Sequence, residues 1–244
     1  KTTDMEQNLS KKTRTESDLI GSREVPESAL YGVQTLRGIE NFRISKFHLN
    51  EYPLFIQALA ITKMGAAVAN RELDLLTEEQ TDAILRACKE ILEGKHHEQF
   101  PVDMIQGGAG TTTNMNINEV VANRALELMG HQRGEYQYCS PNDHVNRSQS
   151  TNDAYPTAIH IGLYYTHLKL VKHFEVLIEA FRKKGSEFAH IIKMGRTQLE
   201  DAVPMTLGQT FNGFASILEH EVKNLDFAAQ DFLTVNMGAT AIGT

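Results

Sequence analysis

The sequence contains little cysteine and no long hydrophobic run, and these absences exclude several classes of protein. Cys88 and Cys139 are its two cysteines, which is too few for a disulfide framework, and their spacing is not that of a metal site. No apolar run reaches the roughly 20 residues of a membrane-spanning helix. The segment 1–12 lacks the apolar stretch of a secretory signal. We therefore expect a reducing, cytoplasmic setting.

Charge of one sign is not concentrated anywhere in the sequence. The formal net charge is −7, and no run of like charges exceeds three residues. This distribution argues against nucleic acid or an anionic membrane as a general partner. With 41% hydrophobic and 23% charged residues, the composition is typical of a globular protein with a sizeable core.

Apolar residues recur at helical spacing from Pro53 onward, and this predicts an all-α fold. The first stripe runs from Phe55 to Ala69. A second helix is expected after Thr77, where Gln80 completes a capping box, and it should end at Gly94. On its apolar face, Cys88 is expected to be an inert core thiol. Asn116 and Glu119 match a cap pair for a third helix, and Val33–Leu36 fits a short strand or an irregular arm.

Two long apolar stripes follow, one from Tyr164 to Ile192 and one from Leu207 to Phe232. The first corresponds to roughly ten turns of helix. Uninterrupted helices of this length belong to coiled coils or large bundles. Two of them cannot bury their stripes alone in a chain of this size. Other subunits or further sequence must therefore complete the bundle.

These patterns divide the chain into three parts. Residues 1–20 are polar and charged and are expected to be disordered. Residues 21–152 should form an N-terminal, mainly helical domain, and residues 153–244 should begin a central bundle of long helices. The last segment, Val235–Thr244, resembles the start of another element more than a tail, which predicts a longer protein.

Three clusters of hydroxyl and amide side chains each precede a predicted helix: Gly110–Asn114, Asn146–Asp153 and Gly195–Gln198. One helix start needs one capping side chain. Capping can explain any one cluster, but it does not explain why all three contain more donors than a cap needs. Neutral donors at helix N-termini also attract anions, which points to a small carboxylate ligand. The glycine-rich run Gln106–Gly110 lacks the Gly-Lys-Ser/Thr ending of a phosphate loop.

The sequence offers no support for a nucleophile or a metal mechanism. It has neither a Ser-x-Gly elbow nor a cluster of cysteine and histidine. His144, in the segment Pro141–His144, is expected to be a buried, hydrogen-bonded histidine more often than a catalytic one.

Three separate motifs resemble those of the aspartase/fumarase superfamily: Gly107–Asn116, Ser150–Pro156 and Lys193–Gln209. The N-terminal segments Gly21–Pro26 and Tyr31–Thr35 are most similar to its aspartase branch. Gln198 points the same way, because class II fumarases carry histidine there and some aspartases carry glutamine. The motifs agree in order and spacing, and the resemblance extends from Gly21 to Thr244.

The resemblance implies a reaction, the reversible removal of ammonia from L-aspartate to give fumarate through an aci-carboxylate intermediate. It assigns the β-carboxylate to Thr111, Ser150 and Thr151. It assigns the amino group or the α-carboxylate to Asn152, Thr197 and Gln198. It also implies no organic cofactor and no metal ligand, and it leaves activation by a divalent ion open. The expected partners are L-aspartate and fumarate, in a homotetramer with composite active sites and without nucleic acid or membrane.

One signature of the superfamily, a Gly-Ser-Ser-x-x-Pro-x-Lys-x-Asn-Pro loop that carries its serine base, does not occur in the 244 residues. The sequence therefore contains most of the binding residues but no base. We predict that the 244-residue polypeptide alone is inactive. An assay of fumarate formation from aspartate checks this, and measurable turnover would contradict it.

Two alternatives stay open at this stage. A class II fumarase would hydrate fumarate instead of adding ammonia, and Gln198 and the segment around Tyr31 favour the aspartase branch. A non-catalytic helical scaffold would need caps but not three donor clusters. Titration with aspartate, fumarate or an analogue would distinguish the scaffold, which should gain no stability from them.

Overall fold

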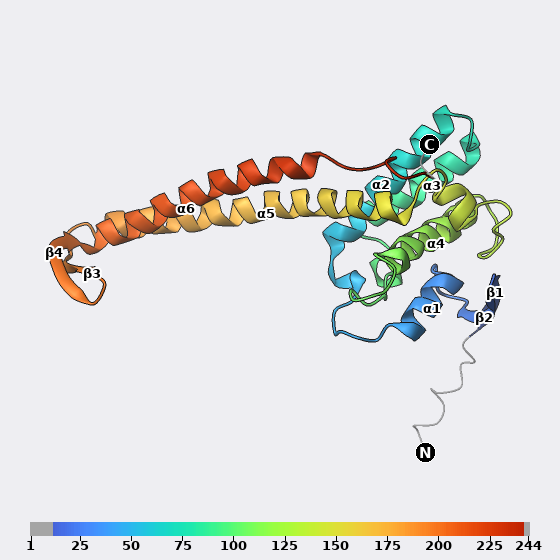
Figure 1. Ribbon diagram of the computed structural model, residues 1–244, viewed down its shortest axis with the longest axis horizontal. Coiled ribbons are helices and arrows are strands. Elements are labelled where there is room, and N and C mark those ends of the chain that lie inside the picture. Colours follow the sequence, from blue (N-terminus) through green and yellow to red (C-terminus); the bar gives the residue numbers. More distant parts are fainter. Residues whose placement is uncertain (1–11, 242–244) are drawn as a thin grey trace, which may run out of the picture. The chain divides into compact units, whose positions relative to one another are not determined.

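The computed structural model describes residues 12–241 and is mainly helical, as predicted (Figure 1). It forms two compact units, residues up to 162 together with those from 235 onward, and residues 163–234. The helices are α1 (Val33–Asn41), α2 (Pro53–Glu72), α3 (Glu78–Leu92), α4 (Thr111–Leu128), α5 (Thr151–Glu187) and α6 (Leu207–Ala229). The strands are β1 (Thr13–Asp18), β2 (Gly21–Pro26), β3 (Ile192–Thr197) and β4 (Glu200–Thr206). Short helical turns are η1 (Leu49–Glu51), η2 (His97–Gln99), η3 (Pro141–Val145) and η4 (Gln230–Leu233).

The expected disorder of residues 1–20 does not extend to Thr13. β1 pairs with β2 in an antiparallel hairpin, and residues 1–11 lie outside the described part of the chain. The arginine of β1 explains the order. Arg14 donates hydrogen bonds to the carbonyl oxygens of Pro26, Ala29 and Tyr31 at 3.1, 2.7 and 2.8 Å. The polar strand β1 is held here by charge-assisted hydrogen bonds, beside a small apolar cluster of Val25, Ala29 and Val33.

The segment Val33–Leu36 begins helix α1 and is neither a strand nor an irregular arm. Its N-cap is Gly32, which has no side chain to accept the first N–H groups. Glu119 of α4 takes this role, because its carboxylate accepts from the backbone N–H groups of Gly32, Gln34 and Thr35 at 2.8–2.9 Å. The prediction that Glu119 caps its own helix is therefore wrong: α4 begins at Thr111, and Glu119 caps α1 instead.

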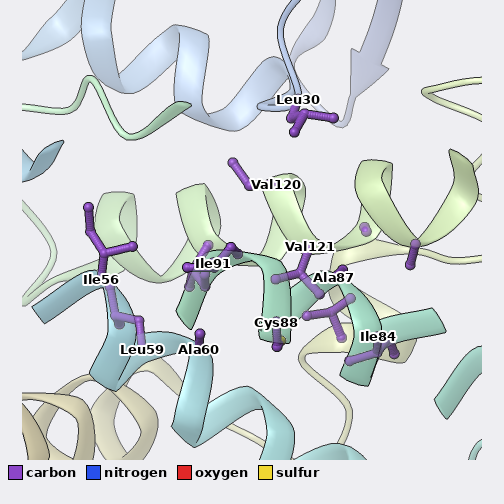
Figure 2. Packing of buried hydrophobic residues seen from close by; sticks show 14 of the residues in the cluster. Leu30, Ile56, Leu59, Ala60, Ile84, Ala87, Cys88, Ile91, Val120 and Val121 are labelled. Carbon is purple, nitrogen blue, oxygen red and sulfur yellow. The ribbon is translucent and has the colours of Figure 1, made fainter. Parts of the chain in front are cut away.

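The core of the first unit lies between α2, α3 and α4 (Figure 2). The predicted start of α3 is confirmed, since Thr77 Oγ1 accepts from the N–H of Gln80 and Gln80 Oε1 accepts from the N–H of Thr77. Gly94 follows the helix with φ +87°, a conformation that suits glycine. Cys88 is fully buried, and burial raises the pKa of its thiol to about 12, so it is an inert core residue.

An ion-pair network on α3 and α4 ties the two helices together. Arg124 of α4 donates to both carboxylate oxygens of Glu90 on α3, at 2.6 and 2.9 Å, and to Glu127 at 2.7 Å. The bond from Arg124 is the main cause that lowers the pKa of Glu90 from 4.5 to about 2. The bidentate geometry is the arrangement in which arginine and carboxylate bind most strongly.

We predict that Glu90→Gln lowers the free energy of unfolding by about 2 kcal/mol at neutral pH. The folded pKa of Glu90 is depressed, so its contribution is present above pH 4.5 and is lost as the pH falls toward 2. The deficit of the variant relative to wild type should therefore shrink below pH 4.5. Urea unfolding at pH 7, 4 and 3 measures this, and a deficit independent of pH would contradict the assignment.

The second unit consists of the later part of α5, the β3–β4 hairpin and α6. Phe181 of α5 packs on Phe211 and Phe214 of α6, with ring centroids 6.0 and 5.6 Å apart, and the two helices run side by side (Figure 1). α5 ends at Glu187, so Ile192 belongs to β3 and not to the predicted helical stripe. Large apolar side chains of both predicted stripes stay exposed, including Leu168 and Phe214 at 41% and 47%. The stripes are thus only partly covered, as expected.

The division between the units falls inside α5, after residue 162, whereas the sequence pattern divides the chain at residue 152. The reason is that the beginning of α5 packs in the first unit. The ring of Tyr155 lies edge-on to Phe55 of α2, and Gly162 lies against α2 near Ala58. In the described part of the chain, no helix combines the length and apolar character that a membrane crossing requires.

Candidate functional site

The first donor cluster lies at the start of α4, after a loop in left-handed conformations. Gly108 and Gly110 have φ +76° and +93°. Gly110 is also required for space, because a Cβ there would lie 2.5–2.6 Å from ring atoms of Tyr155. Tyr155 belongs to the first turns of α5, so this close approach brings the starts of α4 and α5 together. Gln106 fixes the loop by accepting from the N–H of Thr113 at 2.8 Å.

The second cluster forms the start of α5, where Ser150 is the capping residue. Ser150 Oγ accepts from the N–H of Asn152 at 3.2 Å. The N–H of Ser150 donates to Asp153 Oδ1 at 3.0 Å, which completes a reciprocal cap. Capping is therefore part of what this cluster does. Capping uses the side-chain oxygen of Ser150, and it does not explain the other hydroxyl and amide groups of the cluster.

A fully buried lysine of α2 joins the two clusters. Lys63 Nζ lies 2.8 Å from Asn114 Oδ1, 2.9 Å from Asn146 Oδ1 and 2.9 Å from Gln149 Oε1. Asn114 in turn donates to Thr151 Oγ1 at 3.1 Å. The segments around Thr111 and Ser150 thus share one buried hydrogen-bond network.

The segment after residue 235 completes the start of α5. Pro156 has no N–H to donate to the carbonyl of Asn152, four residues earlier. Asn236 supplies that bond, with Nδ2 3.0 Å from Asn152 O. Asp153, which is fully buried, accepts from the hydroxyl of Thr240 at 3.1 Å. The proline inside the helix is therefore compensated from a distant part of the chain.

The hydroxyls of Ser150 and Thr151 are free to donate. Each is partly exposed, and among the described residues each accepts one hydrogen bond and donates none. The hydroxyl of Thr111 is exposed but donates to Gly108 O at 2.6 Å, so it has to rotate before it can bind a ligand. The amide of Asn152 is exposed beside them. Four of the six predicted binding residues therefore lie in this unit.

The other two, Thr197 and Gln198, lie at the turn of the β3–β4 hairpin in the second unit. The prediction that this cluster precedes a helix is wrong, because Ile192–Thr197 pairs with Glu200–Thr206. Both side chains are exposed, and Gln198 has φ +52°. Gly195 is required in β3, since a Cβ there would lie 2.9 Å from Val203 O.

His144 is a hydrogen-bonded residue of the first unit and not part of the donor clusters. Nδ1 of His144 accepts from the N–H of Ser140 at 2.7 Å, and burial lowers its pKa, so it is hydrogen-bonded as expected. In residues 12–241, no group of three histidine, cysteine or acidic side chains could hold a metal ion.

The sequence did not lead us to Lys63, and Asn114 was recognised only as a member of the first donor cluster, without its role in this network. A signal was available for Lys63, because it shares one face of α2 with Leu59, Ala66 and Ala67, all of which are buried. A lysine on an apolar face needs a polar partner inside the protein. Asn114 has no comparable signal, since an asparagine near a helix start is usually a cap.

The family model described as "Lyase" matches residues 21–244. The chain is 58% identical over 232 residues to an aspartate ammonia-lyase of Pseudomonas canavaninivorans, covering 95% of this chain and 49% of the relative. It is 56% identical over 237 residues to that of Escherichia coli K12, covering 97% and 50%. The chain therefore spans about half the length of the curated relatives it matches.

Two solved structures are also similar. One is a fumarate lyase:delta crystallin from Brucella melitensis bound to cobalt, with a TM-score of 0.93 and 52% identity over 96% of this chain and 51% of that one. The other is a class II fumarase from Schistosoma mansoni, with a TM-score of 0.86 and 36% identity over 96% and 49%. Both agree with the helical fold described above.

Proposed function

Because this chain belongs to the lyase family, we propose that it provides the dicarboxylate-binding part of an enzyme that converts L-aspartate to fumarate and ammonia. The observation that carries the proposal is the pair of free hydroxyls at the start of α5, Ser150 and Thr151. A cap needs one oxygen, whereas a carboxylate ligand needs several donors. The high identity to aspartate ammonia-lyases supports the choice of substrate.

The residue types suit the reaction. Removing the proton next to the β-carboxylate concentrates negative charge on its oxygens. Fixed neutral donors stabilise that charge without reorganising, and one such donor contributes about 3 kcal/mol. Ser150, Thr151 and, after rotation, Thr111 would donate to the β-carboxylate. Asn152 would hold the amino group or the α-carboxylate. Thr197 and Gln198 of the second unit would have the same role in a site to which several subunits contribute.

The proposal includes assembly. The exposed apolar side chains of the second unit need partners, and a homotetramer of long helices would supply them while combining residues of several subunits in each site. The reaction calls for a base and hydrogen-bond donors, so the proposal includes no organic cofactor. A cytoplasmic location fits a substrate of central metabolism.

A direct assay tests the proposed reaction. The native protein, incubated with L-aspartate, should release fumarate and ammonia in equal amounts, measured by ultraviolet absorbance and an ammonia assay. L-malate should give no fumarate. Conversion of malate together with no conversion of aspartate would instead support the fumarase alternative.

A further inference from the structure

Within residues 12–241, the buried Lys63 has no acidic partner in contact with its Nζ atom. The side chain is 0% exposed, and the atoms around Nζ are the three amide oxygens of Asn114, Asn146 and Gln149, at 2.8–2.9 Å. An ammonium group has three donors and no acceptor. The match between three donors and three oxygens assigns the charged form to Lys63, although burial lowers its pKa to about 7 against the opposing influence of the Asp153 carboxylate.

A donor-only neighbour decides how each amide is oriented. Because the oxygen of an amide faces Nζ, its NH2 group must point away from the lysine. The NH2 group of Asn114 donates to Thr151 Oγ1 and to Asn146 Oδ1, both at 3.1 Å. That of Asn146 donates to Gln149 O at 3.0 Å, and that of Gln149 to Val145 O at 2.9 Å. Without Lys63, the amide of Asn114 could turn and accept the proton of Thr151 instead.

We propose that Lys63 is a positioning residue that acts through Asn114 to make Thr151 donate its hydroxyl proton to a carboxylate ligand. Every bond in this chain points the same way, from Nζ to Asn114, from Asn114 to Thr151, and from Thr151 to the ligand. Hydrogen bonds aligned in this manner polarise and strengthen one another. The inference rests on the proposed function, because it takes Thr151 as a binding residue.

A double-mutant cycle on the native protein tests the inference, with succinate as an unreactive dicarboxylate and calorimetry as the readout. Lys63→Met and Thr151→Val should each weaken succinate binding about 10- to 100-fold, the value of one hydrogen bond to a charged group. In the Thr151→Val background, Lys63→Met should weaken binding by no more than about threefold, because its effect passes through the absent hydroxyl. Fully additive losses would overturn the inference.

The control is Asn123→Ala, which removes another buried amide of α4. Asn123 donates to Leu30 O and Tyr136 Oη and accepts from the N–H of Gly134, so its loss should also lower stability. The Asn123→Ala variant should bind succinate with the same affinity as the wild type. If it fell as far as that of Lys63→Met, the effect would reflect general loosening and the inference would fail.

Two further outcomes are distinguishable. If Lys63→Met does not fold, Asn114→Ala takes its place in the cycle. It removes the link to Thr151 while Lys63 keeps its bonds to Asn146 and Gln149, and the same non-additivity is expected. If succinate binding by the wild type depends on Lys63 as expected but the protein does not convert aspartate, the proposed function fails and this inference stands. If the wild type binds no succinate, the inference fails, and if it also converts no aspartate, both fail.

Discussion

Replacing Ser150 by alanine should lower the turnover of aspartate by the native protein about 100- to 1,000-fold, the loss typical of one preorganised donor to a developing oxyanion. Ser150 Oγ already accepts the N–H of Asn152, so its proton is available to the substrate. The donor matters most when charge builds on the β-carboxylate. We therefore expect a larger fall in kcat than rise in KM. Steady-state measurement of fumarate formation gives both constants.

The control for this prediction separates capping from binding. Thr77 caps α3 through the N–H of Gln80, in the same manner as Ser150 caps α5. Thr77→Ala and Ser150→Ala should both lower the free energy of unfolding by about 1 kcal/mol. Thr77→Ala should leave kcat unchanged. Equal and small effects of the two variants on kcat would show that Ser150 is only a cap.

Replacing Glu119 by alanine should destabilise the fold more than any other single change considered for this unit. The carboxylate accepts three backbone N–H groups at the start of α1, and each buried donor left unpaired costs about 1–3 kcal/mol. The expected loss is roughly 4 kcal/mol or more. The carboxylate also lies close to the backbone that it caps: a Cβ added at Gly32 would be 2.9 Å from Glu119 Oε1.

Urea unfolding followed by circular dichroism measures this loss, with the exposed Glu93→Ala expected to stay within about 0.5 kcal/mol of wild type. Burial raises the pKa of Glu119 to about 7, although its bonds with Thr35, Gln34 and Gly32 lower it. A raised folded pKa stabilises the protein fully below pH 4.5, and that contribution is lost as the pH rises through 7. Glu119→Ala should therefore lose more stability at pH 5 than at pH 8. Equal losses at the two pH values would contradict this and show that the carboxylate is ionised throughout.

The local sequence predicts those features whose cause is local. The capping box of Thr77 and the apolar face of α3 are confirmed because every residue involved lies within a few turns of helix. The start of α1 could not be predicted, since its cap comes from Glu119, far along the chain. The cap pair expected at Asn116 and Glu119 failed for the same reason: a good local match does not show which helix a carboxylate faces.

The β3–β4 hairpin shows a second limit. Ile192 continues the spacing of the preceding helix, so the apolar pattern alone extended α5 too far. The strands lack regular alternation of buried and exposed residues, and nearly all their side chains are exposed. The hydroxyl clusters were easier to recognise because their excess of donors is visible in the sequence. The amide network behind them, held by Lys63, depends on tertiary contacts.

The bond from Asn236 to the carbonyl of Asn152 also bears on the order of events during synthesis. The two residues are 84 positions apart, and Asp153 receives its bond from Thr240 across 87. A ribosome releases Ser150 and Thr151 long before Asn236 has been made. The nascent chain therefore carries an unfinished helix start for that interval, and the start of α5 is completed only when the later segment emerges and docks.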